Sequence, residues 1–368
     1  MSLYYSLEEI RRLSYLVRGY IQQRRCRVIK KSPRKASDAT AKADFEPMEA
    51  LLVTAIPQGE QWAYEPKWDG FRCITFRDGD KVELQSKSGQ SLTRYFPEIV
   101  DAVRKTKATR FGLDGELVIP VGKAFSFDDL LQRIHPAPSR VQKLAQEFPA
   151  MLILFDLLMD EKGTSLLDET LEFRRAKLER FATKYLKGRT RFDLSPQTPD
   201  VAVARQWLES SGLQLDGIVA KRLDLPYQSG ERTGMQKIKK LRTADCVVGG
   251  FRYASNKRVV GSLLLGLYDD KGLLHHVGFT AAFKETEKQE LTKKLEPLIQ
   301  PPGFTGNKPG GPSRWSTQRS GEWEPLAPKL VVEIQYDHFT GGRFRHGTKL
   351  LRWRPDKKPR ACKFDQIK

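Results

Sequence analysis

The sequence predicts an α+β fold in which a domain of antiparallel sheets and helices precedes a five-stranded β-barrel of the OB type. Its 368 residues are enough for about two domains, each with an apolar core. Up to about residue 240, strand-like and helix-like segments mix without the regular βαβ order of a parallel sheet. Beyond that point, five strand-like segments and one helix share residues 244–368, a content typical of an OB-type barrel.

The first 44 residues differ in composition from the rest and predict a basic helical extension. Ser6 and Glu9 have the spacing of a capping box. Five apolar residues recur at helical spacing: Leu7, Ile10, Leu13, Val17 and Ile21. Residues 1–37 carry ten basic and two acidic side chains. Two interpretations stay open, namely a solvated extension and an arm that contacts a polyanionic partner.

Residues 45–240 have a globular composition, and turn signals separate short apolar runs along them. The predicted strands are Cys73–Phe76, Lys81–Gln85, Phe111–Ile119, Met151–Leu158 and Leu215–Ala220. Helical periodicity predicts helices near Phe96–Lys105, Ser126–Gln132 and Leu171–Phe181. This mixed order favours largely antiparallel sheets with helices between the strands.

Residues 244–368 predict the barrel domain. The predicted strands are Cys246–Tyr253, Ser262–Tyr268, Leu273–Thr280, Leu330–Tyr336 and Leu350–Arg354. One helix near Glu285–Ile299 interrupts them, and a Gly- and Pro-rich loop spans Pro301–Ser320. Barrels of this type commonly bind nucleic acids.

Charge and cysteine content narrow the classes of function. A net charge of +19 and a pI near 9.7 predict a polyanionic partner, and nucleic acid comes before membrane. The longest apolar runs are short, and Met151–Leu158 contains Asp156, so we expect no membrane-spanning helix. Four scattered cysteines predict reduced thiols in a cytoplasmic protein. His275 and His276 are expected to alternate faces of a strand rather than bind a metal.

The segment Glu65-Pro66-Lys67-Trp68-Asp69-Gly70-Phe71-Arg72 carries the most specific chemical signal. A lysine attacks phosphorus only as the free amine, so neighbouring cations or desolvation must favour that form. The Asp69-Gly70 turn can expose the Lys67 amine at the head of a cleft, and Arg72 can hold a phosphate or sugar oxygen. The alternative interpretation is a plain hairpin with a surface lysine.

Three later segments also combine carboxylates or lysines with strands. Asp114-Gly115-Glu116 places two carboxylates in an apolar run, and Asp216–Lys221 flanks a strand with a carboxylate and a lysine. In Lys237-Ile238-Lys239 the two lysines lie on one face of a strand and can point at the same phosphate. Each segment alone also fits an ordinary turn or a solvated face, and their order along the chain is what strengthens the signal.

In this order the segments resemble the motifs of the covalent nucleotidyltransferases, the superfamily of DNA ligases and mRNA-capping enzymes. Lys67 matches motif I, and Ser86–Ser88 resembles motif Ia. The remaining likenesses are Asp114–Glu116 to motif III, Leu154–Asp156 to motif IIIa, Asp216–Lys221 to motif IV, Lys237–Lys239 to motif V and Arg352–Lys357 to motif VI. The resemblance covers about residues 45–368.

Within the superfamily the chain is most similar to bacterial ATP-dependent DNA ligases of the ligase C type. The segments that carry this likeness are Phe45–Met48, Tyr95–Glu98, Arg133–Pro136, Arg242–Cys246 and Ser262–Gly266. NAD-dependent ligases share the Lys-x-Asp-Gly pattern but add an NMN-binding domain, a zinc module and a helix-hairpin-helix module. None of these modules is visible in the sequence.

The resemblance implies a basic extension at 1–44, a nucleotidyltransferase domain at 45–240 and an OB-fold domain at 244–368. It implies an enzyme that seals nicks through a lysyl-AMP intermediate in DNA repair, with roles in recombination and replication. It also implies ATP and Mg²⁺, for which Mn²⁺ can substitute, and nicked double-stranded DNA as the partner of a cytoplasmic monomer. The two domains are expected to close for the first step and reopen for DNA, about a hinge near Lys240–Thr243.

The same resemblance implies a role for each matching residue. Lys67 is implied as the nucleophile that takes AMP from ATP, Glu65 near the adenine, and Phe155 as the ring that stacks on it. Phe155 fits an ordinary strand core almost as well. The implied groups for sugar and phosphates are Arg72, Lys87 and Glu116 at the ribose, Lys221, Lys237 and Lys239 at the α-phosphate, and Arg354 and Lys357 at the pyrophosphate. Glu116 and Asp216 are implied to serve magnesium.

Two residues depart from the usual motifs. Lys87 stands where motif Ia usually has arginine, so the planar fork of a guanidinium is lost. Asp216 stands where motif IV usually has glutamate, which is one methylene longer. Asp216 is therefore expected to reach the metal either directly or through a water molecule.

Three alternative hypotheses compete with a DNA ligase function. A capping-type enzyme would load GTP onto Lys67, whereas an RNA ligase would lack the strands predicted after residue 245. A basic OB-type protein that only binds nucleic acid would not need Lys67 at all.

Overall fold

The computed structural model describes residues 46–122, 124–210, 215–255, 257–310 and 322–367. The chain forms two compact units that divide between Lys240 and Leu241. Both units mix helices with mainly antiparallel strands, which confirms the predicted α+β class. The predicted extension at residues 1–44 and part of the Gly- and Pro-rich loop lie outside the described residues.

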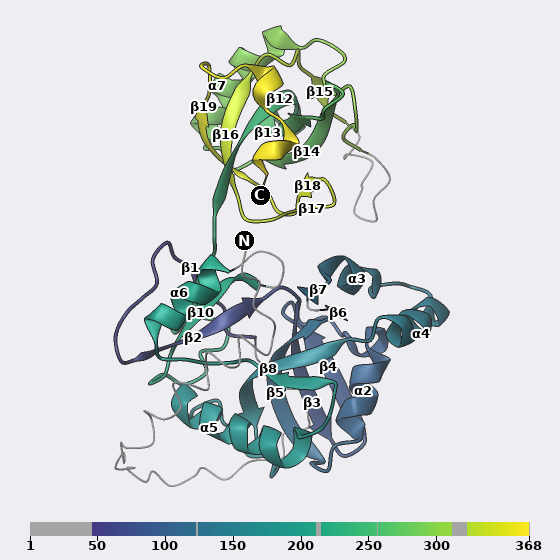
Figure 1. The fold of residues 1–368 in the computed structure, drawn as a ribbon, viewed down its shortest axis with the longest axis vertical. Coiled ribbons are helices and arrows are strands. Elements are labelled where there is room, and N and C mark those ends of the chain that lie inside the picture. The colour runs from purple at the N-terminus through teal and green to yellow at the C-terminus, as the bar shows by residue number, and fades with distance from the viewer. Residues whose placement is uncertain (1–45, 123, 211–214, 256, 311–321, 368) are drawn as a thin grey trace. The chain divides into compact units, whose positions relative to one another are not determined.

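A five-stranded sheet forms the larger layer of the first unit. Its strands are, in spatial order, β4 (Lys81–Ser86), β3 (Phe71–Asp78), β5 (Arg110–Val118), β8 (Met151–Met159) and β9 (Phe192–Leu194). Neighbouring strands are antiparallel, except that β8 and β9 are parallel. Helix α2 (Pro97–Arg104) packs on β4, and α5 (Leu171–Phe181) runs along β8 (Figure 1). Together they cover a large apolar core.

A four-stranded sheet forms the second layer. Its strands are, in order, β1 (Leu51–Leu52), β11 (Met235–Ile238), β10 (Leu215–Arg222) and β2 (Trp62–Trp68). Helix α6 (Val201–Glu209) packs on β10 and β2, where its Trp207 joins a core that includes Trp62, Tyr64 and Trp68. Because side chains alternate along a strand, Glu65 and Lys67 of β2 point away from this core.

A small apolar cluster links strands of both sheets. Its buried members are Met48, Ile74, Phe76, Leu158, Tyr227 and Met235. Ile74 and Leu158 belong to the five-stranded sheet, and Met235 belongs to the four-stranded sheet. Arg72 lies two residues before Ile74, and Lys237 lies two residues after Met235, so these polar residues share the inner faces of the two sheets with the cluster.

Two short helices and one hairpin complete the first unit. They are α3 (Phe127–Gln132), α4 (Pro138–Glu147) and the pair β6 (Pro120–Val121) and β7 (Ala124–Phe125), and a π-helical turn at Ala182–Leu186 extends α5. Arg133 is fully buried and donates to both Glu98 oxygens of α2, at 2.7 and 2.8 Å. This bidentate pair ties the α3 segment to α2.

The second unit is built on one curved sheet. Its strands are, in order, β14 (Leu274–Thr280), β13 (Lys257–Tyr268), β12 (Arg242–Ala254), β16 (Val331–Tyr336) and β19 (Lys349–Trp353), and β15 (Glu324–Pro325) pairs with β12. Helix α7 (Glu285–Leu295) packs on β13, and a hairpin joins β17 (Phe339–Thr340) to β18 (Arg343–Phe344). The five predicted strands and the helix are therefore present within a few residues of their predicted bounds.

The edges of this sheet meet at one place. Thr280 at the end of β14 forms a parallel bridge with Thr348, which precedes β19. Thr348 donates its backbone N–H to the Phe279 carbonyl at 3.1 Å, and the Thr280 hydroxyl donates to the Thr348 carbonyl at 2.9 Å. Over the described residues the sheet is curled but not closed along its whole length.

Candidate active site

Lys67 lies where the chain passes from one sheet to the other. Strand β2 ends at Trp68, and β3 begins at Phe71 after the Asp69-Gly70 turn. The plain hairpin is wrong, because β2 pairs with β10 while β3 pairs with β4 and β5. A Cβ on Gly70 would lie 2.2 Å from the Leu117 carbonyl oxygen, so only glycine fits this crossing.

Asp216, at the start of β10, connects the nucleophile candidate to a second lysine. Its Oδ2 lies 2.7 Å from Lys67 Nζ and 3.0 Å from Lys239 Nζ. Burial alone would raise the pKa of Asp216, but the charges of Lys67 and Lys239 outweigh it, so the pKa is lowered. Asp216 is thus an anion at neutral pH and holds both amines.

Lys239 reaches Asp216 because the backbones of β10 and the end of β11 approach closely. Gly217 has a φ of +126°, and a Cβ there would lie 2.1 Å from the Ile238 carbonyl oxygen. Lys237 lies nearby on β11, and its pKa is lowered by burial and then by the charges of Lys67, Lys239 and Lys87. The predicted pair of lysines is therefore part of one cationic cluster with Lys67.

Glu116 faces the same cluster from β5, where it pairs in register with Arg72. Burial raises its pKa to about 7, although the charges of Lys67 and Arg72 act in the opposite direction. This partly buried carboxyl lies close enough to the Lys67 amine for their charges to interact.

Arg72 is locked into a network that the sequence motifs did not single out. Its guanidinium donates to both Asp114 oxygens, at 3.0 and 2.6 Å, and to the Met48 carbonyl at 2.5 Å. The Tyr227 hydroxyl donates to Asp114 at 2.9 Å. Asp114 lies inside a quoted motif, but no sequence signal pointed to Tyr227.

Glu65, Lys221 and Phe155 form a second group. Lys221 Nζ lies 2.9 Å from Glu65 Oε2 and 4.4 Å from the centroid of the Phe155 ring. The amide of Gln197 donates to Glu65 Oε1 at 3.0 Å. Lys221 is five residues from Asp216 along an extended strand, a span of roughly 16 Å. The structure thus brings Lys221 to Glu65 rather than to the Asp216 cluster.

Lys87 follows β4 and contacts a carboxylate that the sequence analysis missed. Its Nζ lies 2.7 Å from Glu49 Oε1, and Arg232 Nη2 lies 2.6 Å from Glu49 Oε2. The hydrogen bond from Lys87 and the charge of Arg232 outweigh burial and lower the pKa of Glu49. Lys87 remains half exposed and can reach a phosphate from this position.

Arg354 and Lys357 belong to the second unit. Arg354 Nη1 lies 2.9 Å from Asp245 Oδ1 and Lys357 Nζ 3.2 Å from Asp245 Oδ2. Arg354 also pairs with Asp356 at 2.8 Å. Asp245 therefore orders both predicted pyrophosphate-binding residues beside β12.

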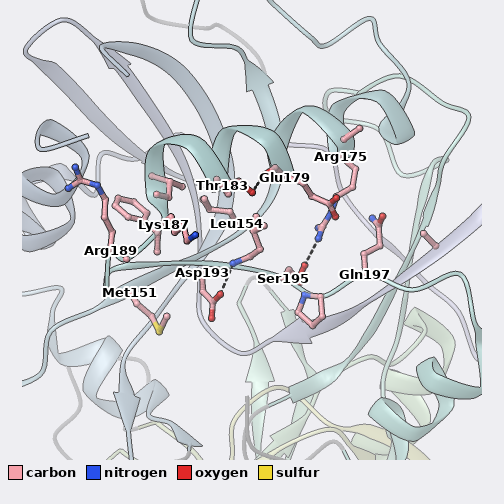
Figure 2. Close-up of a pocket in the computed structure, with 18 of the residues that line it drawn as sticks. Met151, Leu154, Arg175, Glu179, Thr183, Lys187, Arg189, Asp193, Ser195 and Gln197 are labelled. Atoms are coloured by element: carbon pink, nitrogen blue, oxygen red, sulfur yellow. Dashed lines mark hydrogen bonds and ion pairs between the residues drawn. The ribbon is translucent and has the colours of Figure 1, made fainter. Parts of the chain in front are cut away.

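Two cavities lie near the group formed by Glu65, Lys221 and Phe155. One, of about 20 Å³, is lined by Arg72, Phe155 and Lys221 and is no larger than a water molecule. The other, of about 1280 Å³, lies beneath α5, and Figure 2 shows Arg175 and Glu179 of that helix above Ser195. None of the predicted site residues lines the larger cavity, but Gln197 does.

The remaining histidines, cysteines and helices of the described residues offer little support for a metal site or a membrane span. Within the described ranges, no group of three or more His, Cys, Asp or Glu side chains can hold a metal ion. Cys73, Cys246 and Cys362 are free thiols, and His275 pairs with Asp269 at 3.0 Å. None of the helices that the structure describes is long and apolar enough to cross a membrane.

Comparisons with known proteins show the family to which the chain belongs. Residues 40–239 match the family model "ATP dependent DNA ligase domain", and residues 256–357 match "ATP dependent DNA ligase C terminal region". The chain is 42% identical over 341 residues to DNA ligase C1 of Mycolicibacterium smegmatis, which covers 90% of this chain and 95% of that protein. It is 42% identical over 335 residues to DNA ligase C of Mycobacterium tuberculosis, covering 87% and 93%.

A solved structure from a structure-function analysis of Lig E DNA ligases superposes with a TM-score of 0.52 at 16% identity. The match covers 83% of this chain and all of that one. At this identity the likeness concerns the fold alone.

Proposed function

The chain belongs to the ATP-dependent DNA ligases, of the bacterial ligase C type, and on this premise we propose that Lys67 is the residue that carries AMP. The enzyme seals DNA through a covalent AMP intermediate that is general to its family. The observation that carries the assignment of Lys67 is its contact with the Asp216 carboxylate, which Lys239 also contacts. Lys237 and Glu116 lie close enough to interact with the charge of Lys67.

The first step is an in-line displacement at the α-phosphorus of ATP. The uncharged Lys67 amine, having lost its proton to water, forms the N–P bond as the bond to the pyrophosphate oxygen breaks. Asp216 orients Lys67 in the free enzyme, and Lys237 and Lys239 neutralise the α-phosphate. Positioning and charge neutralisation provide most of the catalysis in such a displacement.

The later steps use the same centre. The 5′-phosphate of a nick attacks the AMP phosphorus and releases Lys67, and the 3′-hydroxyl then attacks the activated 5′-phosphate and releases AMP. Glu65 lies at the adenine, Phe155 stacks on it, and Arg72, Lys87 and Glu116 hold the ribose and the neighbouring phosphate. Lys221 Nζ lies 4.4 Å and the Arg72 guanidinium 5.4 Å from the centroid of the Phe155 ring, so two cations border the ring on which the base stacks.

A divalent cation, Mg²⁺ or in its place Mn²⁺, fits Glu116 and Asp216. Both are carboxylates within electrostatic reach of Lys67, and hard oxygen donors suit these ions. The bound cation supplies charge neutralisation at the reacting phosphate. A cation at Asp216 also competes with Lys67 for that carboxylate.

We assign the nucleotidyltransferase domain to residues 45–240 and an OB-fold domain to residues 244–368. The strand order of the second unit and the parallel contact between Thr280 and Thr348 support the OB assignment. Arg354 and Lys357 of that domain orient the leaving pyrophosphate. The substrate is nicked double-stranded DNA, handled by a monomer in DNA repair.

The test is the intact mass of the protein after incubation with a nucleotide and Mg²⁺. We expect ATP to add one adenylyl group to the wild type, GTP to add nothing, and Lys67→Ala to remain unmodified and inactive on nicked DNA. Lys81→Ala, at the exposed start of β4, is the matched control and should behave as wild type. Nick sealing by Lys67→Ala with ATP would refute the assignment.

A further inference from the structure

We propose that Gln197 is a positioning residue that sets the Glu65 carboxylate for recognition of the adenine 6-amino group. The inference rests on the proposed function, in which Glu65 lies at the base. Gln197 belongs to none of the sequence motifs and is 132 residues from Glu65 along the chain. It gives the enzyme selectivity for adenine over purines with a 6-oxo group.

The Glu65 carboxylate is held from both sides. Its side chain is 2% exposed, Oε2 accepts from Lys221 at 2.9 Å, and Oε1 accepts from the Gln197 amide at 3.0 Å. One donor fixes one oxygen, but two donors on different oxygens fix the plane of the group. Without Gln197, the carboxylate is free to turn toward Lys221.

Gln197 itself stands in a segment that is fixed at its N-terminal end to the five-stranded sheet. Ser195 donates its backbone N–H to the Leu154 carbonyl of β8 at 2.8 Å. The Ser195 hydroxyl accepts from the Trp68 indole at 3.0 Å. Figure 2 shows the second bond, in which the Ser195 carbonyl accepts from Arg175 at 2.8 Å. Ser195 is fully buried, so these bonds are shielded from water.

The C-terminal end of the segment is fixed to the other sheet. Thr198 and Tyr64 of β2 exchange both backbone hydrogen bonds, at 2.8 and 3.0 Å, and both residues are buried. Tyr64 directly precedes Glu65 in β2. The backbone on either side of Gln197 is therefore anchored, and its amide reaches Glu65 from a preorganised position.

The chemistry of the carboxylate defines what it selects. An ionised carboxylate only accepts hydrogen bonds, and each oxygen can accept a second one. The 6-amino group of adenine donates, whereas the 6-oxo group of guanine or hypoxanthine places a second acceptor against Glu65. Two acceptors that face each other away from water, with no donor between them, cost binding free energy. A fixed carboxylate therefore discriminates more strongly between adenine and a 6-oxo purine than a mobile carboxylate does.

The experiment separates binding of the base from chemistry. Gln197→Met keeps the length of the side chain but removes the donor, and Gln197→Ala is a second variant that removes volume instead. KM and kcat for AMP transfer to Lys67 are measured with ATP, and the corresponding constants with purine riboside triphosphate, which lacks the 6-amino group. We expect KM for ATP to rise about 10-fold with kcat nearly unchanged, and no change for the purine analogue.

Gln206→Ala, on the exposed side of α6, is the matched control and should leave every constant as in the wild type. An equal rise in KM for both nucleotides, or no rise in either variant, would overturn the role of Gln197. Thermal unfolding of each variant shows whether it is folded. A wild type that forms no adduct on Lys67 would instead defeat the proposed function, so the two failures are distinguishable.

Discussion

At the residue scale, the site is organised by carboxylates that each hold two cations. Asp216 holds Lys67 and Lys239, and Glu49 holds Lys87 and Arg232. Such sharing keeps the like charges of the lysines apart in the absence of substrate phosphates. It also means that a phosphate entering the site competes with a carboxylate already in place.

Glu116 makes stability depend on pH. Its usual pKa is 4.5, and the folded protein raises it to about 7. Below pH 4.5 the carboxyl is protonated in both states. Between pH 4.5 and 7 the unfolded chain ionises first, so stability falls as pH rises and stays lowered above 7. Glu116→Gln should therefore raise the free energy of unfolding by about 1–3 kcal/mol at pH 8 and far less at pH 4.5.

Urea unfolding in the presence of EDTA measures this difference. Glu290→Gln, at an exposed position of α7, is the matched control and should show the same small effect at both pH values. A gain for Glu116→Gln that is equal at pH 4.5 and pH 8 would contradict the raised pKa.

At the element scale, the approach of β10 to the end of β11 depends on Gly217. Alanine there meets both a φ of +126° and a carbonyl oxygen 2.1 Å from its Cβ. We expect Gly217→Ala to cost about 2–4 kcal/mol of stability and to slow AMP transfer, because Lys239 shifts from Asp216. Gly79→Ala, in an open turn with a φ of +59°, should cost only about 1 kcal/mol. Equal losses in the two variants would argue against the close approach.

The sequence predicted the elements with clear periodicity and missed those without it. Strand β2 was not predicted because Pro66 interrupts it, and proline usually marks an edge or a break. The predicted helix at Glu285–Ile299 ends its α-helical part at Leu295, since Pro297 lacks the N–H that the next turn needs. Helices α4 and α6 were also missed, although they are longer than the predicted helices α2 and α3, so their length does not explain the omission.

Motif order located the site residues, but not their neighbours. Lys67, Asp216 and Lys239 lie in motifs, and the structure brings all three together. Gln197 and Glu49 reach the site only through the way distant segments pack, which no local pattern encodes. The separation of Lys221 from Asp216 likewise follows from their distance along β10, while the motif grouped them as one unit.

At the scale of the whole molecule, the net charge of +19 governs the encounter with DNA. We expect the logarithm of the DNA-binding constant to fall steeply with the logarithm of salt concentration, because each phosphate contact releases counterions. Removing residues 1–40 should lower the affinity and flatten the slope by about 2 or more if the arm contacts phosphates. Fluorescence anisotropy from low to moderate salt measures both slopes, and an unchanged slope would favour a solvated extension.

The connection between the two units carries one of the site residues. Strand β11 ends at Ile238 and β12 begins at Arg242, so only residues 239–241 join them. The first of these, Lys239, is bound to the same carboxylate as the nucleophile. We therefore expect a change in the backbone conformation of residues 239–241 to alter the contact of Lys239 with Asp216, and with it the charge that surrounds Lys67.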